Sequence, residues 1–195
     1  MSHPENMLRT NNAFLSYIEA LYQAQQRRED ILLKEFSAAQ LLLQQGEKPT
    51  KVMLLKEGIT TCYFNEGDDK RFIVEFLGKG EIIGELEIIK NVPCLCNIKA
   101  LTPVKVYAIS IPYFRSLLEK ELPFNKLLLE SFAERIINTS SRASFQQLNT
   151  VEHTLSKLLA LIKEQEINIS KEDMAAYLGI TIRSLNRTLK KLQQE

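Results

Sequence analysis

The segment NISKEDMAAYLGITIRSLNRTLKKL, residues 168–192, has the pattern of two short helices joined by a tight turn. Ser170, with Asp173 three residues later, is typical of a helix start, because a side-chain oxygen there accepts a bond from a free backbone N–H. Gly179 stands where a turn needs positive φ, which glycine adopts without strain. Thr181 is the expected cap of the second helix. The segment therefore predicts a helix-turn-helix.

The second of these helices has two contrasting faces. One carries leucines at helical spacing, and the other carries polar and basic side chains. Four Lys or Arg and no Asp or Glu lie between Gly179 and Gln194. Such a helix fits the major groove of DNA, where side chains reach base edges and phosphates. A helical hairpin with a solvated basic face is the alternative, but the single sign of the charge favours DNA binding.

The chain as a whole is not basic. Its 195 residues carry 25 Lys and Arg against 24 Asp and Glu, a net charge of +1. Affinity for DNA must therefore come from a local patch, and that patch is C-terminal. The length suits one large domain or two small ones. No stretch resembles a transmembrane span or a secretory signal, so we expect a cytoplasmic protein without a membrane partner.

The cysteines Cys62, Cys94 and Cys96 are too few, and too poorly spaced, for a zinc or iron–sulfur site of their own. We therefore expect no metal and no cofactor. Cys94 and Cys96 are expected to share a strand and point to one face, where they are not well placed to bond each other. Reduced, buried thiols are the favoured interpretation, and a redox sensor is the alternative.

Upstream of the helix-turn-helix, the spacing of the apolar residues changes twice. Residues 11–28 have apolar side chains at helical spacing. From residue 31 to residue 111, short apolar pieces alternate with turn signals such as Gly58 and Gly78–Gly80. Many short strands of this kind predict a barrel, sandwich or jelly roll. From Pro112 onward the spacing is helical again.

A long helix is predicted from Pro123 to about Leu148. Its apolar and small residues recur at alternating steps of three and four, the pattern of a dimer seam. The alternative is a helix packed only within its own chain. Two-fold symmetry would place two recognition helices about one DNA turn, ~34 Å, apart. Asn149 and Thr150 predict a break and a new helix cap. The predicted seam comprises Leu129, Phe132, Ile136, Thr139 and Ala143.

Strands, a long helix and a helix-turn-helix, in this order, resemble the Crp/Fnr superfamily of bacterial transcription regulators. The segment GEIIGE, Gly80–Glu85, is similar to the phosphate-binding cassette of cyclic-nucleotide-binding domains, and residues 83–89 resemble the YeiL-like branch. In cAMP-binding members, the second glycine and glutamate of the cassette meet the phosphate and the ribose hydroxyl. The resemblance implies an effector pocket that comprises Gly84, Glu85, Cys94, Leu95, Asn138 and Thr139.

This chain departs from the nucleotide-binding pattern at two positions. The resemblance aligns Cys94 and Leu95 with the arginine and serine that hold the cyclic phosphate. A thiol and an isobutyl group supply no charge-assisted donors, and losing such a buried bond costs about 1.5–3 kcal/mol. We therefore expect a pocket whose effector is an unknown small molecule other than cAMP or cGMP.

The recognition helix departs from the family as well. The resemblance aligns Ile182, Arg183 and Arg187 with a base-reading arginine, glutamate and arginine, and only Arg187 matches. The usual half-site is therefore not transferred to this chain. Arg183 and Arg187, helped by Ser184 and Asn186, are the predicted base readers. The predicted phosphate contacts are Ser170, Lys171, Thr181, Lys190 and Lys191.

Together these observations predict an α+β chain. Residues 1–122 are expected to form a jelly-roll (double-stranded β-helix) sensor domain with an N-terminal helix, residues 123–148 a dimerisation helix, and residues 149–195 a winged-helix-type domain whose wing is expected to be truncated. The predicted function is a homodimeric regulator that binds a palindromic site in double-stranded DNA, with RNA polymerase as a further candidate partner. A signalling module that binds a cyclic nucleotide or another small molecule and acts through protein contacts is the alternative. No catalytic constellation points to an enzyme.

Overall fold

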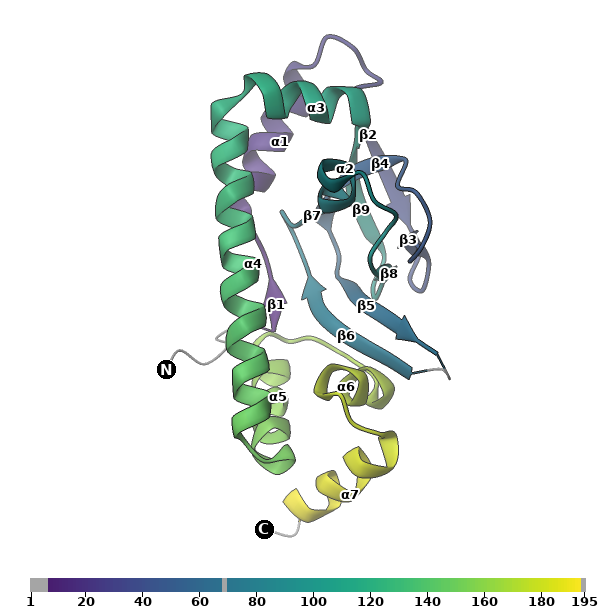
Figure 1. Cartoon of the computed structure of the whole chain (residues 1–195), viewed down its shortest axis with the longest axis vertical. Coiled ribbons are helices and arrows are strands. Elements are labelled where there is room, and N and C mark those ends of the chain that lie inside the picture. The colour runs from purple at the N-terminus through teal and green to yellow at the C-terminus, as the bar shows by residue number, and fades with distance from the viewer. Residues whose placement is uncertain (1–6, 68–69, 194–195) are drawn as a thin grey trace.

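The computed structural model describes residues 7–67 and 70–193. Helix α4 (Leu122–Leu148), 27 residues long, runs along one side of the elongated molecule (Figure 1). The strands lie beside its first part, and the C-terminal helices gather at its far end. This order of elements confirms the predicted α+β class, with a strand-rich domain followed by a helix-turn-helix.

The strands form two open sheets rather than a closed barrel. All pairings are antiparallel except that of β1 with β6. The first sheet contains, in order, β1 (Leu8–Arg9), β6 (Lys70–Leu77), β5 (Thr60–Glu66), β8 (Asn97–Ala100) and β3 (Leu41–Leu43). The second contains β2 (Ile31–Phe36), β9 (Val104–Ser110), β4 (Lys51–Glu57) and β7 (Ile82–Ile83).

Strand β9 shows how the core is arranged. Val106 and Ala108 pack into a cluster between the two sheets, together with Leu55 and Ile98. The alternate residues of β9 pack on the other side, against helices α1 (Asn12–Ala24), α3 (Ile111–Lys120) and α4. Because both faces of β9 are covered, its sequence is an almost unbroken apolar run.

An aromatic cluster fixes α4 to the strand domain. The Phe124 ring lies 5.5 Å from that of Phe14 and 5.8 Å from that of Phe114, both in edge-on arrangements. All three side chains are fully buried. Aromatic pairs of this geometry add to the burial of their surface, so the start of α4 is held rigidly against α1 and α3.

One prediction from the strand-like region was wrong. Cys94 and Cys96 do not share a strand, since both precede β8 in an irregular segment. Helix α2 (Glu85–Lys90), which begins after Gly84 at φ 82°, was not predicted, because a short apolar run does not distinguish a strand from a short helix. Strand β1 was not predicted either, because two residues are too few to show the alternation of apolar and polar side chains that marks a strand.

The C-terminal helices α5 (Val151–Glu164), α6 (Lys171–Leu178) and α7 (Ile182–Leu192) confirm the predicted helix-turn-helix and its caps. The Ser170 hydroxyl accepts a bond from the Asp173 N–H at 3.0 Å, and Thr181 accepts one from Ser184 at 3.1 Å. Gly179 has φ 67°, as the turn requires. In the part of the chain that the structure describes, no helix combines the length and apolar character needed to cross a membrane.

Candidate DNA-binding surface and effector cavity

Helix α7 buries its leucine face and exposes its basic face. Leu185 is fully buried and packs with Leu155 of α5 and Ala175 of α6. The predicted base readers Arg183 and Arg187 are exposed on the outer side of the helix. Lys190 and Lys191 are exposed near its end, where Lys191 Nζ lies 3.4 Å from Glu152 Oε1. Positive charge on this face is therefore largely uncompensated.

The remaining predicted DNA contacts fall into two groups. Lys171, Asn186 and Lys190 line one surface hollow between α6 and α7. The hydroxyl oxygens of Ser170 and Thr181 accept backbone N–H bonds as helix caps, which leaves each hydroxyl proton free to donate to a phosphate. Ser184 is half-buried behind the helix start, and its carbonyl accepts a bond from the Thr188 hydroxyl.

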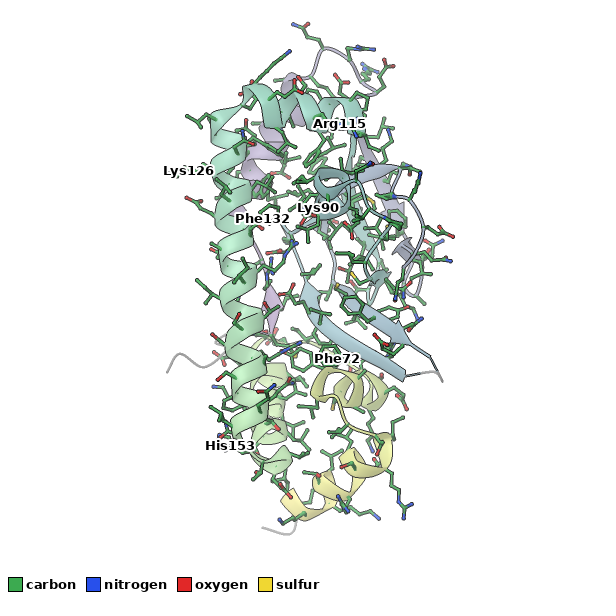
Figure 2. All side chains as sticks on the ribbon, viewed as in Figure 1. Phe72, Lys90, Arg115, Lys126, Phe132 and His153 are labelled. Carbon is green, nitrogen blue, oxygen red and sulfur yellow. The ribbon has the colours of Figure 1, made fainter. Side chains whose placement is uncertain are left out.

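The helix-turn-helix is fastened to the strand domain by two arginines that sequence reasoning did not identify. Arg71 of β6 pairs with Asp173 of α6. The buried Arg142 of α4 donates to the Ile73 carbonyl of β6 at 3.3 Å and lies over the Tyr177 ring of α6 at 4.6 Å. Phe72, which Figure 2 shows above α6, is its second ring partner, at 5.4 Å. Arg142 therefore joins α4, β6 and α6; we call it the Arg142 clamp.

The N-terminal strand reinforces this junction. Met7 is buried in a cluster with Leu158 and Tyr177, which belong to the C-terminal helices. The Leu8 N–H donates to Gln165 Oε1 at 2.9 Å. Strand β1 thus contacts the helix-turn-helix unit while it pairs with β6 of the first sheet.

A largely apolar cavity of about 150 Å³ lies between the first sheet, α2 and α4. Its polar side chains are Cys62, Cys96, three glutamates, Arg135 and Thr139. An engineered apolar cavity of roughly this volume takes up benzene. The apolar lining comprises Leu43, Phe64, Val74, Leu77, Ile82, Ile83, Leu86, Leu95 and Ile98.

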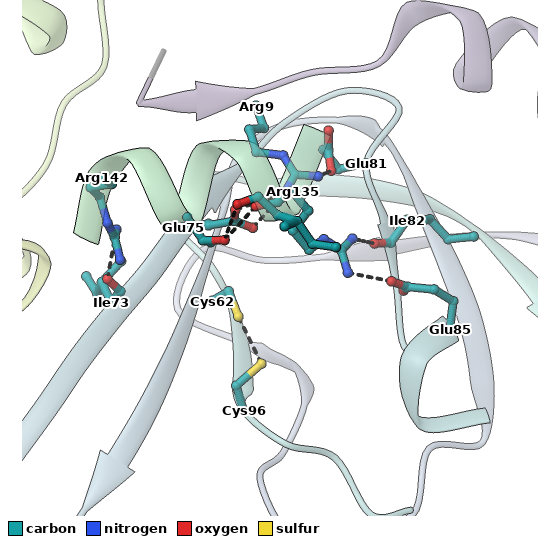
Figure 3. Close-up of polar contacts among 12 residues, drawn as sticks. Arg9, Cys62, Ile73, Glu75, Glu81, Ile82, Glu85, Cys96, Arg135 and Arg142 are labelled. Atoms are coloured by element: carbon teal, nitrogen blue, oxygen red, sulfur yellow. Dashed lines mark hydrogen bonds and ion pairs between the residues drawn. The ribbon is translucent and has the colours of Figure 1, made fainter. Parts of the chain in front are cut away.

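One end of the cavity is closed by buried ion pairs (Figure 3). Arg135 of α4 donates to Glu85 Oε1 at 2.6 Å and to the Ile82 carbonyl at 3.2 Å. Burial raises the pKa of Glu85, and the Arg135 charge opposes that rise. Behind this pair, Arg9 of β1 bonds both oxygens of Glu75 at 2.9 Å and also pairs with Glu81. Each arginine is thus paired with at least one buried carboxylate, while the Nε atoms of Arg9 and Arg135 are buried without a hydrogen-bond partner.

The structure brings together four of the six predicted pocket residues. Gly84, Glu85, Leu95 and Thr139 line the cavity. Cys94 does not, because it points into the core between the sheets, where burial raises its thiol pKa to about 11. Asn138 also lies outside; it lines a small adjoining hollow beside Arg9 and Arg142, which shares Glu75 and Thr139 with the cavity. Cys62, Cys96 and Arg135 were missed, and no motif marks them.

The exposed stripe of α4 has Ala133 and Ser140 in place of Phe132 and Thr139 of the predicted seam. Leu129, Ile136 and Ala143 are exposed as predicted. Phe132 packs against the core, and the Thr139 hydroxyl donates to the Arg135 carbonyl at 2.6 Å, so both face the strand domain. The exposed stripe, which we call the α4 stripe, comprises Leu129, Ala133, Ile136, Ser140, Ala143 and Gln147.

Comparison with known proteins agrees with this architecture. Residues 33–121 match the family model of the cyclic nucleotide-binding domain, and residues 147–195 match that of the Crp-like helix-turn-helix domain. The chain is 24% identical over 174 residues to the cAMP-activated global transcriptional regulator CRP of Pasteurella multocida, which covers 84% of this chain and 83% of that protein. It is 24% identical over 161 residues to the regulatory protein YeiL of Escherichia coli O157:H7, covering 80% and 72%.

A solved structure shares the fold. The c-di-GMP responsive global regulator CLP of Xanthomonas campestris superposes with a TM-score of 0.77 at 19% identity, covering 94% of this chain and 92% of that one. With the nucleotide-binding-type domain, the long helix and the Crp-like helix-turn-helix in one chain, this protein belongs to the Crp/Fnr family of transcription regulators. The predicted family is therefore confirmed, and its relatives in these comparisons are regulators rather than enzymes.

Proposed function

We propose that this protein is a homodimeric regulator that reads a palindromic DNA site with α7 and responds to a small, largely apolar effector. The exposed, uncompensated basic face of α7 is the observation that carries the DNA-reading part. Arg183 and Arg187 project near the start and middle of the helix, where side chains reach base edges in the major groove. Lys171, Lys190 and Lys191, with the capping hydroxyls, contact phosphates.

The test is selection of DNA sites from a random pool by the purified protein, at two salt concentrations and without added ligand. We expect an enriched palindrome whose half-sites are about one helical turn, ~34 Å, apart. Enrichment of unrelated sequences with only weak, salt-sensitive retention would overturn specific reading. RNA polymerase is a further candidate partner, to be tested by transcription from the selected site.

Dimerisation is proposed through the α4 stripe. Leu129 is 67% exposed and Ile136 65% exposed in the single chain. They recur with small residues at steps of four and three, which suits helix packing across a two-fold axis. The stripe lies roughly a quarter turn around α4 from Arg135 and Thr139, the two residues of this helix that line the cavity.

We expect Ile136→Glu to convert the dimer into a monomer, because it places a charge in the centre of the α4 stripe. Light scattering coupled to gel filtration measures the change. The variant should keep its fold, since Ile136 is mostly exposed in the monomer. Leu33→Glu, at a half-exposed leucine of β2, is the matched control and should remain a dimer. An unchanged dimer in Ile136→Glu would place the interface elsewhere.

The cavity favours an apolar effector over a cyclic nucleotide. Glu85, the residue that the family resemblance assigns to the ribose hydroxyl, is bonded by Arg135. Cys94 and Leu95 stand where the resemblance expects phosphate donors, and Cys94 points away from the cavity. A cyclic phosphate placed there would meet apolar side chains without charge-assisted donors. The unidentified effector is expected to be small and mostly hydrocarbon.

We expect cAMP and cGMP to give no saturable heat in calorimetric titration at millimolar nucleotide. The reason is the loss of phosphate donors and the occupation of Glu85 by Arg135. Saturable binding that is abolished by Glu85→Gln would support the alternative function, a nucleotide-binding signalling module. Titration in the presence of the selected DNA site controls for a form that binds nucleotide only on DNA.

Helix α4 links the cavity to the DNA-binding unit. Arg135 and Thr139 line the cavity, and the Arg142 clamp lies two helical turns beyond Arg135 on the same helix. An effector that repositions α4 would change the packing of Arg142 on Tyr177 and Phe72. Differential binding to the two arrangements is what shifts their populations. The proposed mechanism is therefore a change in how α6 and α7 are held.

A further inference from the structure

Two cysteines far apart in sequence meet in the cavity wall. Cys62 lies on β5, and Cys96 directly precedes β8, the strand that pairs with β5. Their sulfur atoms are 2.9 Å apart, closer than non-bonded sulfurs normally approach, and 34 residues separate them in the chain. Figure 3 shows the two side chains pointing at each other, with Arg135 and Glu85 at the adjoining end of the cavity.

The third cysteine is set apart from this pair. Cys94 is 3% exposed and packs among aliphatic side chains between the sheets. Cys62 and Cys96 are only partly buried, and both line the cavity, so a small molecule that enters it reaches their sulfur atoms. Cys94 is therefore a buried control thiol, in the same chain, for the reactivity of Cys62 and Cys96.

We propose that Cys62 and Cys96 form a dithiol site that a peroxide converts into an intramolecular disulfide. One sulfur attacks the peroxide oxygen, the O–O bond breaks, and a sulfenic acid and one water form. The second sulfur then attacks the sulfenic sulfur, the S–O bond breaks, and a second water leaves. Overall the two thiols lose two electrons and two protons, which reduce one hydrogen peroxide to two waters.

The two sulfurs share one hydrogen bond. That bond with Cys96, together with burial, raises the pKa of the Cys62 thiol well above its usual value. Either sulfur can be the donor of the bond. Either one can therefore attack the peroxide first, while the other resolves the sulfenic acid.

The disulfide would change the wall of the effector cavity. It would cross-link β5 to the segment before β8 and close a loop of about the 34 residues that separate the two sulfurs. A cross-link of this length restricts the unfolded chain and so raises the denaturation midpoint. It also removes two thiol hydrogens from the mostly apolar lining, which gives the cavity an oxidised and a reduced form.

The test counts thiols on the intact protein and does not depend on DNA binding. The protein is treated with hydrogen peroxide, quenched with catalase, unfolded, and labelled with a maleimide before mass analysis. We expect the labelled thiols to fall from three to one in the wild type and from two to none in Cys94→Ser. Cys62→Ser and Cys96→Ser should each keep two labelled thiols after a mild dose, apart from any sulfenic acid that dimedone traps at the one cysteine left in the cavity.

Peptide mapping without reduction identifies the bond. A linked peptide pair containing Cys62 and Cys96, in a protein that remains non-cross-linked between chains, is the expected result. The urea midpoint of the wild type and of Cys94→Ser should rise on oxidation and return with dithiothreitol. Three labelled thiols after peroxide, a bond that includes Cys94, or sulfinic acids in place of the disulfide would each overturn the proposal. Mapping the wild type keeps the test decisive even if a serine variant fails to fold.

Discussion

Replacing Arg183 and Arg187 together by alanine is expected to abolish specific DNA binding while leaving the fold intact. Both side chains are exposed on the outer face of α7, and neither makes a described ion pair. A good bidentate contact to a base contributes ~1–3 kcal/mol of discrimination. Two such losses amount to roughly 2–6 kcal/mol, or about 30-fold to 10⁴-fold in affinity. Fluorescence anisotropy on the selected site measures the difference.

The matched control removes the same charge elsewhere. Arg115 on α3 and Lys126 on α4 are exposed at the opposite end of the molecule from α7 (Figure 2). Arg115→Ala/Lys126→Ala should bind the selected site within a small factor of the wild type. Arg183→Ala/Arg187→Ala should retain only salt-sensitive binding that does not distinguish the site from scrambled DNA. Equal affinity of the two double variants would refute reading by α7.

Arg135→Met should destabilise the protein by about 3–5 kcal/mol at neutral pH, since removing one partner of a buried ion pair leaves the other charge uncompensated. Glu85 is 1% exposed and depends on Arg135 for its opposing charge. Glu85→Gln combined with Arg135→Met should recover most of the loss, because two neutral side chains of similar volume need no counter-charge. Urea denaturation followed by circular dichroism gives the free energies of unfolding.

The loss of stability in Arg135→Met should also increase as the pH rises. Burial already raises the pKa of Glu85, and removing the Arg135 charge raises it further. The folded state then binds the proton more tightly than the unfolded state, so stability is present below the ordinary glutamate pKa and is lost as pH rises through the raised one. Arg135→Met should therefore be closest to wild type in mildly acidic solution.

Two variants serve as controls for this prediction. Lys126→Met removes an exposed partner of Glu130 on the same helix and should change stability by less than about 0.5 kcal/mol. The double variant should lack the extra pH dependence of Arg135→Met, as it has no carboxyl at position 85. A loss in Arg135→Met that the double variant does not recover would mean that Arg135 acts by packing rather than by its charge.

The features that the sequence predicted well are those governed by local rules. Ser170, Gly179 and Thr181 specify a cap, a turn and a second cap within a dozen residues, and each adopts the expected geometry. Strand β9 was recognisable from its apolar run. Family resemblance added the expected effector pocket around Gly84 and Glu85, which no local pattern contains.

The features that were missed depend on contacts between distant residues. Cys62 meets Cys96, and Arg135 meets Glu85, across 34 and 50 residues respectively. Nothing near Arg142 in sequence indicates that it is buried against Ile73 and Tyr177. Phe132 of the predicted seam packs against the core of its own chain for a related reason. A helix that packs on two sides carries two apolar stripes, and their superposition blurs the period of each.

Strand β1 is held by partners that lie far along the chain. Arg9 bonds Glu75, 66 residues later, and the Leu8 amide bonds Gln165, 157 residues later. During synthesis the bond to Gln165 can form only after α5 has been made, so until then one side of the strand is unanchored. The strand domain and the helix-turn-helix therefore reach their final packing only after the chain has been synthesised beyond α5.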